Sequence, residues 1–509
     1  MPAFIDNLLN RITMYRLVLY YLLGLFAIAV IFGFLGIVPY APLSLIISAL
    51  IITAVSLGAN AIFARVFEAH ANVESVYISA LILTLIITPP QTNPFEYSVL
   101  PILIWAPLLA MASKYILAIG KKHIFNPAAL AVAITAFTIG QSASWWIGGT
   151  VPLLFFVLAG GILVVRKIQR SDLVLAFLAG AGAMIIGTTI SGNPLVILEK
   201  AALYSPIFFF AFVMLTEPLT MPPTRPLRIA YGVLTGLLFA PAIHIGGIYS
   251  TPELALIAGN IFSYIASPKG KYTLKLKEKA LVGSDMYEFV FEADQKLSFR
   301  PGQYFEWTLG HVRPDDRGNR RYFTIASSPT ESDVRLGVKF YAPPSTFKKS
   351  LFRMVKGDTV VASQLAGEFV LPRDQNKKLV FIAGGIGITP FRSMVQYLID
   401  NGEKRAITVM YSNRTASEIA YRDIWDRATR ELGIKTVYTL TDAKSAPLNW
   451  DGYVGHINET MIIKEIPDYK ERIFYISGPR SMVVACKKVL GGMGIKKSRV
   501  KVDFFPGFA

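Results

Sequence analysis

The sequence predicts a multidomain membrane protein: an all-α polytopic region, then a small antiparallel β-barrel, then an α/β doubly wound domain. Two observations separate the first part from the rest. Of the 85 Asp, Glu, Lys and Arg residues, only 20 fall in residues 1–268, and long apolar runs recur throughout that stretch. A third observation divides the remainder, where short alternating strands give way to strands that alternate with amphipathic helices. We therefore expect domains at residues 1–267, 268–374 and 375–509.

The first domain contains ten apolar runs, and most of them reach the ~20 residues that a helix needs to cross a bilayer. With the N-terminus inside, basic residues gather in the connections on that side, as the positive-inside rule expects. The opposite connections hold only Lys200. We expect a cell (inner) membrane location with both termini in the cytoplasm. The runs are 14–38, 42–66, 76–88, 99–119, 125–145, 149–165, 172–190, 200–216, 229–247 and 252–267, and the inside residues are Arg65, Lys114, Lys121, Lys122, Arg166, Lys167, Arg170, Arg225 and Arg228.

Two of these runs break at matching places. The third ends in proline-rich residues 88–94 and the eighth in residues 215–226, five segments later. An odd offset brings the two breaks in from opposite sides of the membrane, which is typical of an inverted repeat with a site near the midplane. The alternative is that the prolines only end helices. Glu217 is the acidic residue placed at such a break, and an intramembrane carboxylate is a candidate for function.

A family resemblance supports this arrangement. Ser113-Lys114-Tyr115 and residues 120–129, with Thr216-Glu217-Pro218, resemble a membrane-subunit family shared by the Na+-translocating NADH:quinone reductase and the Rnf complex. The resemblance implies a urea-transporter-like inverted repeat that contains a flavin, with Asn126, Thr216 and Glu217 as candidate contacts. That family attaches FMN to a threonine after Ser-Gly-Ala. Here Ser191-Gly192 is followed by Asn193, which leaves non-covalent FMN or riboflavin as the candidate.

Composition excludes several other classes. One cysteine, Cys486, cannot ligate an iron–sulfur cluster. Two stacked haems need about four membrane histidines, and only His123 and His244 lie in or near the apolar runs. The net charge of +17 is explained by basic residues that orient membrane helices and meet anionic lipid. We expect no metal site and no nucleic-acid partner.

The strand-rich part carries the strongest motif in the chain. Arg321-Tyr322-Phe323-Thr324 offers a guanidinium for a pyrophosphate, an aromatic ring to stack on an isoalloxazine, and a hydroxyl to bond near N5. The segment from Ser345 to Ser350 opens a helix whose N–H groups suit phosphates. The motif resembles the Arg-x-Tyr-Ser/Thr of the ferredoxin–NADP reductase superfamily, with Phe323 in place of the tyrosine, and the resemblance implies FAD.

A glycine-rich turn follows the first strand of the last domain. Backbone amides in such a turn can approach a pyrophosphate closely. Together with Ser477, which stands where the superfamily has a cysteine near the nicotinamide, the turn resembles that superfamily's nucleotide site. The terminal Asp503 and Phe505 resemble its closing segment. The implied nucleotide contacts are Gly384, Gly385, Gly387, Thr389, Pro390, Gly478, Pro479 and Met482.

Ser412, Arg414 and Tyr421 follow the second strand of this domain, where the adenosine ribose is read. An arginine there favours a 2′-phosphate, but the choice between NADH and NADPH stays open. Within the site we expect catalytic roles for Thr324, Ser477 and Asp503.

These features predict an NAD(P)H-dependent, FAD-containing transmembrane oxidoreductase. Hydride would pass to FAD, and electrons through a membrane flavin to an extracytoplasmic or membrane acceptor, such as a flavoprotein or a quinone. Two alternatives stay open: a redox-driven Na+/H+ pump, and a solute channel that the reductase module regulates. The number of flavins per chain separates the channel from electron transfer, and ion movement coupled to turnover would identify the pump.

Overall fold

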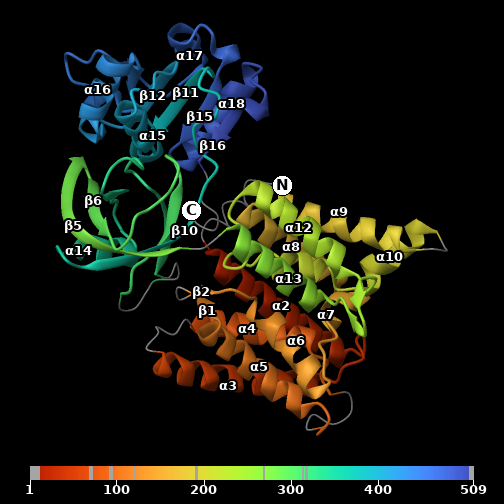
Figure 1. The fold of residues 1–509 in the computed structure, drawn as a ribbon. Helices are drawn as coiled ribbons and strands as arrows, with labels where there is room; N and C mark the ends of the chain where they lie inside the picture. The colour runs from red at the N-terminus through yellow and green to blue at the C-terminus, as the bar shows by residue number, and fades with distance from the viewer. Residues whose placement is uncertain are drawn as a thin grey trace. The chain divides into compact units, whose positions relative to one another are not determined.

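The computed structural model describes residues 12–67, 73–90, 96–119, 122–189, 193–267, 270–311, 315 and 319–503. Its contacts divide the chain into two compact units, and the boundary in the sequence falls between Lys269 and Gly270. We call residues 1–269 the helical unit and residues 270–505 the C-terminal unit, and describe each by itself (Figure 1).

The first half of the helical unit begins with α2. Thr13 caps the N-terminus of this helix, because its side chain accepts a hydrogen bond from the Arg16 N–H. Short two-stranded ribbons separate some helices. The elements are α2 (Met14–Phe34), α3 (Pro42–Val66), α4 (Val73–Ile86), α5 (Leu100–Ile116), β1 (Ala118–Ile119), β2 (Lys122–His123) and α6 (Pro127–Ile139). Several begin with proline in the first turn, where its missing N–H costs no hydrogen bond.

The second half begins with a short helix and contains the least regular backbone of the unit. A 69° bend separates α10 from the helix that follows it, and that helix ends in the π-helical turn η1. The elements are α7 (Trp146–Gly149), α8 (Val151–Ile168), α9 (Ser171–Gly187), α10 (Pro194–Tyr204), α11 (Ile207–Phe209), η1 (Phe210–Met214), α12 (Arg225–Phe239), β3 (His244–Ile245), β4 (Ile248–Tyr249) and α13 (Pro252–Ala266).

Helices occupy each of the ten apolar stretches, with bounds that differ from the sequence prediction. The sixth runs three residues further, to Ile168, and the eighth begins at Pro194 rather than at residue 200. Among the described residues, three helices (α2, α3 and α8) are long and apolar enough to cross a membrane, or four if the bent pair counts as one span. The helical unit therefore has the character of a membrane-associated region.

Glycines set the closest helix contact in this unit. Gly232 and Gly236 on α12 face α9, where Gly180 lies opposite. A Cβ at Gly236 would stand 2.4 Å from the Phe177 carbonyl oxygen, and one at Gly232 would stand 2.7 Å from the Leu173 oxygen. Small residues allow helix backbones to approach where no hydrophobic effect drives association.

The C-terminal unit begins with a six-stranded antiparallel sheet and one helix. The elements are β5 (Lys271–Gly283), β6 (Met286–Ala293), β7 (Tyr304–Thr308), β8 (Arg320–Thr324), β9 (Val334–Lys339), α14 (Thr346–Arg353) and β10 (Thr359–Ala366). Strand order is β8-β7-β10-β5-β6-β9, and the end strands β8 and β9 are not paired. The sheet curls around an aromatic core that includes Trp307 and Phe291, so the antiparallel β-barrel that the sequence predicted is a half-open one.

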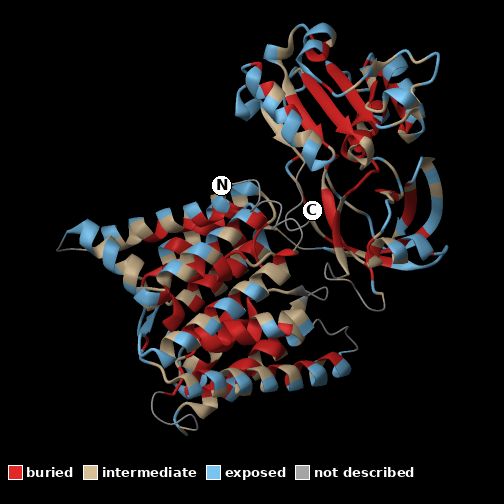
Figure 2. Ribbon diagram, turned by 180° about the vertical axis from the view of Figure 1, so that it is seen from behind, coloured by how far each residue is buried: buried red, intermediate tan, exposed pale blue. Residues whose placement is uncertain are grey.

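The second sheet is wholly parallel, with order β14-β13-β12-β11-β15-β16. Its central strands are buried on both faces (Figure 2), which explains their unbroken apolar sequences. The principal elements are β11 (Leu379–Gly384), η2 (Gly385–Ile388), α15 (Thr389–Asp400), β12 (Ile407–Asn413), α16 (Arg422–Leu432), β13 (Lys435–Leu440), β14 (Tyr453–Val454), α17 (Glu459–Glu465), β15 (Ile473–Ser477), α18 (Arg480–Gly492) and β16 (Val500–Val502).

The chain leaves β11 toward β12 on one side and later returns to β15 on the other. In doubly wound sheets, ligands bind at the carboxyl ends of the strands where the strand order reverses. Here that point lies between β11 and β15.

The close contact between α9 and α12 gives a stability prediction. Substitution Gly236→Ala places a methyl group against the Phe177 carbonyl and should cost about 1–3 kcal/mol, the usual range for overpacking. The control is Gly24→Ala on α2, where a Cβ meets nothing within 4 Å and helix propensity improves. We expect a lower thermal unfolding midpoint in detergent for G236A and an unchanged or higher one for G24A. Equal midpoints for the two variants would contradict the packing argument.

Candidate functional site

Two glycine-containing turns pack against each other where the parallel sheet splits. A Cβ at Gly384 would stand 2.4 Å from the Met482 sulfur, and one at Gly387 would stand 2.5 Å from the Ser477 carbonyl oxygen. Gly478 faces the Gly384 backbone in the same way. A side chain at Gly387 would collide with the backbone of the other turn, and one at Gly384 with the Met482 side chain, so the glycines keep the backbone of this surface accessible. That is the requirement for close approach by a pyrophosphate.

The other predicted nucleotide residues lie at the same edge. Gly385 has φ +50, a left-handed conformation that glycine adopts without strain. Thr389 and Pro390 form the first turn of α15, and Pro479 is the N-cap of α18. The turn therefore leads directly into a helix N-terminus, as the sequence indicated.

The three residues expected to be catalytic are brought together from three strands. Asp503 follows β16, Ser477 ends β15 and Thr324 ends β8. The Ser477 hydroxyl donates to Asp503 Oδ2 at 3.1 Å, and the Thr324 hydroxyl donates to the same oxygen at 3.5 Å. Burial raises the pKa of Asp503 to about 7, although these two hydrogen bonds oppose the shift. The carboxyl group can therefore gain or lose a proton near neutral pH.

On β8, side chains alternate between the two faces of the strand. Arg321 and Phe323 lie toward α14, where the Arg321 guanidinium is 5.2 Å from the Phe347 ring centroid and the Phe323 ring is 5.9 Å from it. Tyr322 lies on the opposite face, and its hydroxyl donates to Glu306 Oε2 at 2.9 Å. Phe323, which is only partly buried, is thus the ring available for stacking.

Arg321 and the N-terminus of α14 already hold an anion. The Asp315 carboxylate accepts from the Thr346 N–H at 3.1 Å and pairs with the Arg321 guanidinium at 3.4 Å. This carboxylate stands in for a phosphate, which needs the same donors. The residues present therefore fit a pyrophosphate. Ser345 caps the helix by accepting from the Lys348 N–H, while the predicted contact Ser350 lies one turn further in.

The adenosine candidates differ in their exposure. Ser412 lies near the end of β12, and Arg414 follows that strand with an exposed side chain. Tyr421 is buried, and its ring lies 5.7 Å from the Arg392 guanidinium carbon. It thus packs inside the unit. Phe505 lies outside the described residues.

In the helical unit, a cavity of about 80 Å³ is lined by all three membrane candidates, Asn126, Thr216 and Glu217. The Glu217 carboxylate accepts from the Asn126 amide at 2.9 Å and from the Thr220 hydroxyl at 3.1 Å, and lies 3.2 Å from His123 Nε2. The remaining walls are mostly apolar. His123 and Thr220 were not predicted as contacts, although both lie within a few residues of the motifs that named Asn126 and Glu217.

The C-terminal unit matches known proteins. Residues 381–488 match the family model described as the oxidoreductase NAD-binding domain. The F subunit of the Na(+)-translocating NADH-quinone reductase of Neisseria meningitidis is 30% identical over 213 residues, covering 39% of this chain and 52% of the relative. The stachydrine N-demethylase reductase subunit Stc4 of Rhizobium meliloti is 30% identical over 228 residues, covering 43% and 64%. The chain spans between about half and two thirds of the length of these relatives.

Among solved structures, the cytochrome P450 reductase GcoB of Amycolatopsis is similar, with a TM-score of 0.42, 22% identity, and coverage of 47% of this chain and 70% of that one. The motifs, the glycine turn and the matched family model together define the class: the C-terminal unit is an NAD(P)H:FAD oxidoreductase domain. This confirms the predicted enzyme class and its FAD and NAD(P)H.

Asp315 gives a prediction about cofactor affinity. If its carboxylate occupies the donors that a pyrophosphate needs, Asp315→Ala removes a competing charge and should tighten FAD binding about tenfold, or roughly 1.4 kcal/mol. Arg321→Gln should weaken binding. Titration of the FAD-depleted protein with FAD, followed by flavin fluorescence, measures both. Unchanged affinity in D315A would show that Asp315 does not compete with the cofactor.

Asp503 gives a prediction about stability and pH. Its pKa is higher in the folded protein than in the unfolded chain, so the folded state binds the proton more tightly. The contribution of Asp503 to stability is therefore greatest at low pH and is lost as pH rises from about 4 to about 7. Because Asp503 is partly exposed, solvent screening reduces the loss of folding free energy to on the order of 2 kcal/mol. The Asp503→Asn variant should gain stability relative to wild type between pH 5 and pH 8 in thermal unfolding. Exposed Asp374→Asn is the control, and a pH-independent difference for D503N would refute the assignment.

Proposed function

We propose that the chain is a transmembrane electron-transfer enzyme in which NAD(P)H donates a hydride at the C-terminal unit and electrons continue through the helical unit. The observation that carries the proposal is that one chain holds both sites. Thr324, Ser477 and Asp503 meet at the split of the parallel sheet, and Asn126, Thr216 and Glu217 line one cavity among apolar helices.

The protein's own groups have distinct tasks at the first site. The amides of the glycine turn bind the nucleotide pyrophosphate, and Arg321 with the first turn of α14 binds that of FAD. Thr324 and Ser477 orient hydrogen-bonding atoms next to Asp503, which exchanges a proton at Oδ2. When bound, FAD supplies an isoalloxazine that takes up an electron pair and gives up electrons singly.

The cavity in the helical unit supports a second carrier. Its apolar walls suit a flat ring, and its Asn126 and Glu217 edge suits ring nitrogens and oxygens. We propose that these groups hold a non-covalent FMN or riboflavin, for which the cavity of about 80 Å³ must widen, because ligand pockets measure roughly 300–1,000 Å³. We propose that residues 1–267 form the ten-segment inverted repeat of the membrane-subunit family that the sequence resembles, with cytoplasmic termini. A relative of the C-terminal unit is named as the F subunit of a Na(+)-translocating NADH-quinone reductase, which agrees with a membrane or extracytoplasmic acceptor.

A vesicle experiment tests the proposal. The full chain is reconstituted into liposomes that enclose ferricyanide, and NADH or NADPH is added outside. We expect the enclosed ferricyanide to be reduced, and Glu217→Gln to slow this at least tenfold. The matched control is the exposed Glu199→Gln on α10 of the same unit. Cofactor extraction should yield two flavins per chain.

Other outcomes identify the alternatives. One FAD per chain with solute flux and no reduction inside the vesicles would favour a regulated channel and overturn the proposal. Uptake of Na+ or H+ in step with turnover would favour a redox-driven pump.

A further inference from the structure

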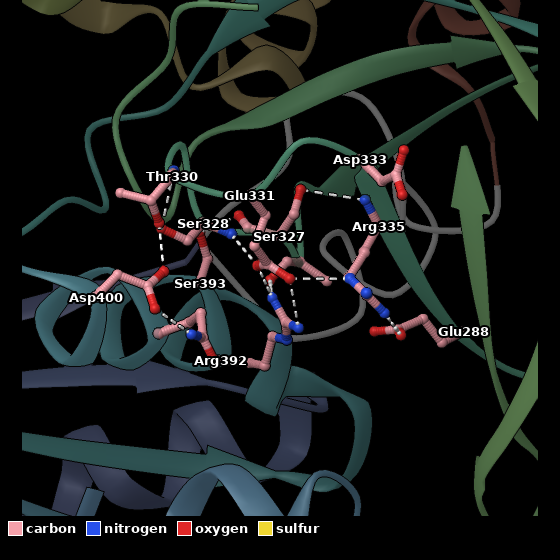
Figure 3. Close-up of polar contacts among 12 residues, drawn as sticks. Glu288, Ser327, Ser328, Thr330, Glu331, Asp333, Arg335, Arg392, Ser393 and Asp400 are labelled. Carbon is pink, nitrogen blue, oxygen red and sulfur yellow. Dashed lines mark hydrogen bonds and ion pairs between the residues drawn. The ribbon is translucent and has the colours of Figure 1, made fainter. Parts of the chain in front are cut away.

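Helix α15 is hydrogen-bonded to the segment that follows the flavin motif at residues 321–324. It begins at Thr389, directly after the glycine turn. From its first turns, the Ser393 hydroxyl donates to the Ser327 carbonyl oxygen at 2.6 Å, and the Arg392 guanidinium donates to the Ala326 carbonyl oxygen at 3.1 Å (Figure 3). Ser393 is 0% exposed and Arg392 5% exposed. These bonds join the parallel sheet's first helix to the antiparallel sheet.

The Glu331 carboxylate anchors the same contact. It accepts hydrogen bonds from both terminal nitrogens of Arg392, with Nη2 at 3.0 Å, and from the Ser328 N–H at 2.6 Å. Arg335 lies 2.9 Å from it through Nε and reaches Glu288 at 2.6 Å (Figure 3). Two arginines and two glutamates thus balance in charge. Arg392 is the buried charge of this contact, with 6% of its side chain exposed, and removing the carboxylate that pairs with it would leave that charge uncompensated.

A second bond reinforces the contact further along α15. The Thr330 hydroxyl donates to Asp400 Oδ2 at 2.5 Å, in the last turn of the helix. The loop after β8 is therefore hydrogen-bonded to the first turns of α15 and to its last turn. Rotation of one sheet against the other would break several of these hydrogen bonds at once.

We propose that Arg392 and Ser393 are positioning residues for hydride transfer. The proposal rests on the first step of the proposed function alone. Thr324 lies two residues before Ala326, and the glycine turn ends shortly before Arg392. The contact therefore ties the backbone that presents the flavin to the backbone that presents the nicotinamide. Hydride transfer requires an approach of about 3–3.5 Å with aligned orbitals, and this contact fixes that approach.

The expected effect is specific to the transfer step. Neither residue belongs to the set that binds FAD or the nucleotide pyrophosphate, so cofactor content and nucleotide affinity should change little. The distance and angle between the rings should change. A role limited to stability would instead lower cofactor content and thermal midpoint without altering the transfer step in the folded fraction.

The test uses the full chain in detergent, loaded with FAD and mixed anaerobically with NADH or NADPH in a stopped-flow instrument. Ser393→Ala removes one neutral bond, and Arg392→Lys keeps the charge but loses the forked geometry. The control is Arg472→Lys, because Arg472 pairs with Asp468 at 2.6 Å and bonds the Leu379 carbonyl within the parallel-sheet part alone. FAD bleaching, the deuterium isotope effect with nucleotide labelled at the transferred hydrogen, and the long-wavelength charge-transfer absorbance are recorded.

We expect S393A and R392K to slow bleaching about tenfold, to enlarge the isotope effect and to weaken the charge-transfer band, with nucleotide Kd and FAD content unchanged. R472K should match wild type. Wild-type rates and isotope effects in both test variants, or equal losses in R472K, would overturn this inference alone. Failure of either nucleotide to bleach FAD in the unsubstituted chain would overturn the proposed function and the inference with it.

Discussion

The close approach of two backbone turns at the split of the parallel sheet is the constraint on which the C-terminal unit depends. Gly384, Gly387 and Gly478 leave no room for a Cβ. Because the turns touch, β11 and β15 must be adjacent and in register, which they are from Leu379 and Ile473 onward. That register places Ser477 at the site and allows Asp503, after the neighbouring β16, to reach it.

The sequence predicted this edge of the molecule well because its determinants are local. Glycine spacing, a preceding apolar run and a following helix all fall within about twenty residues of Leu379, and each has its own physical meaning. The parallel sheet followed from motifs of this kind, and the catalytic roles of Thr324, Ser477 and Asp503 stay predictions. The half-open form of the first sheet was not predicted, because whether β8 and β9 pair depends on curvature and not on their composition.

Long-range charge pairing was also beyond reach. Arg392 and Glu331 are 61 residues apart, and nothing in either segment names the other as its partner. The pair of Asp315 and Arg321, only 6 residues apart, was missed for another reason: the acidic residues there look like part of a solvated loop. Tyr421 was predicted as a nucleotide contact from its position after β12; its ring is buried beside Arg392, and its role in binding stays a prediction.

The helical unit places its polar groups where its backbone is least regular. The bend after α10, the π-helical turn η1 and the irregular residues 215–224 fall in one stretch, which ends in the segment that carries Glu217. In an apolar environment, backbone that leaves the helix is tolerated only where protein or a cavity satisfies it. Thr216 and Thr220 bond to backbone within this stretch, and Asn126, Thr220 and His123 surround the carboxylate. A regular helix would bury its polar groups at lower cost. Because Asn126, Thr220 and His123 surround the Glu217 carboxylate, its polar atoms have partners, which allows this irregular backbone to persist among apolar helices.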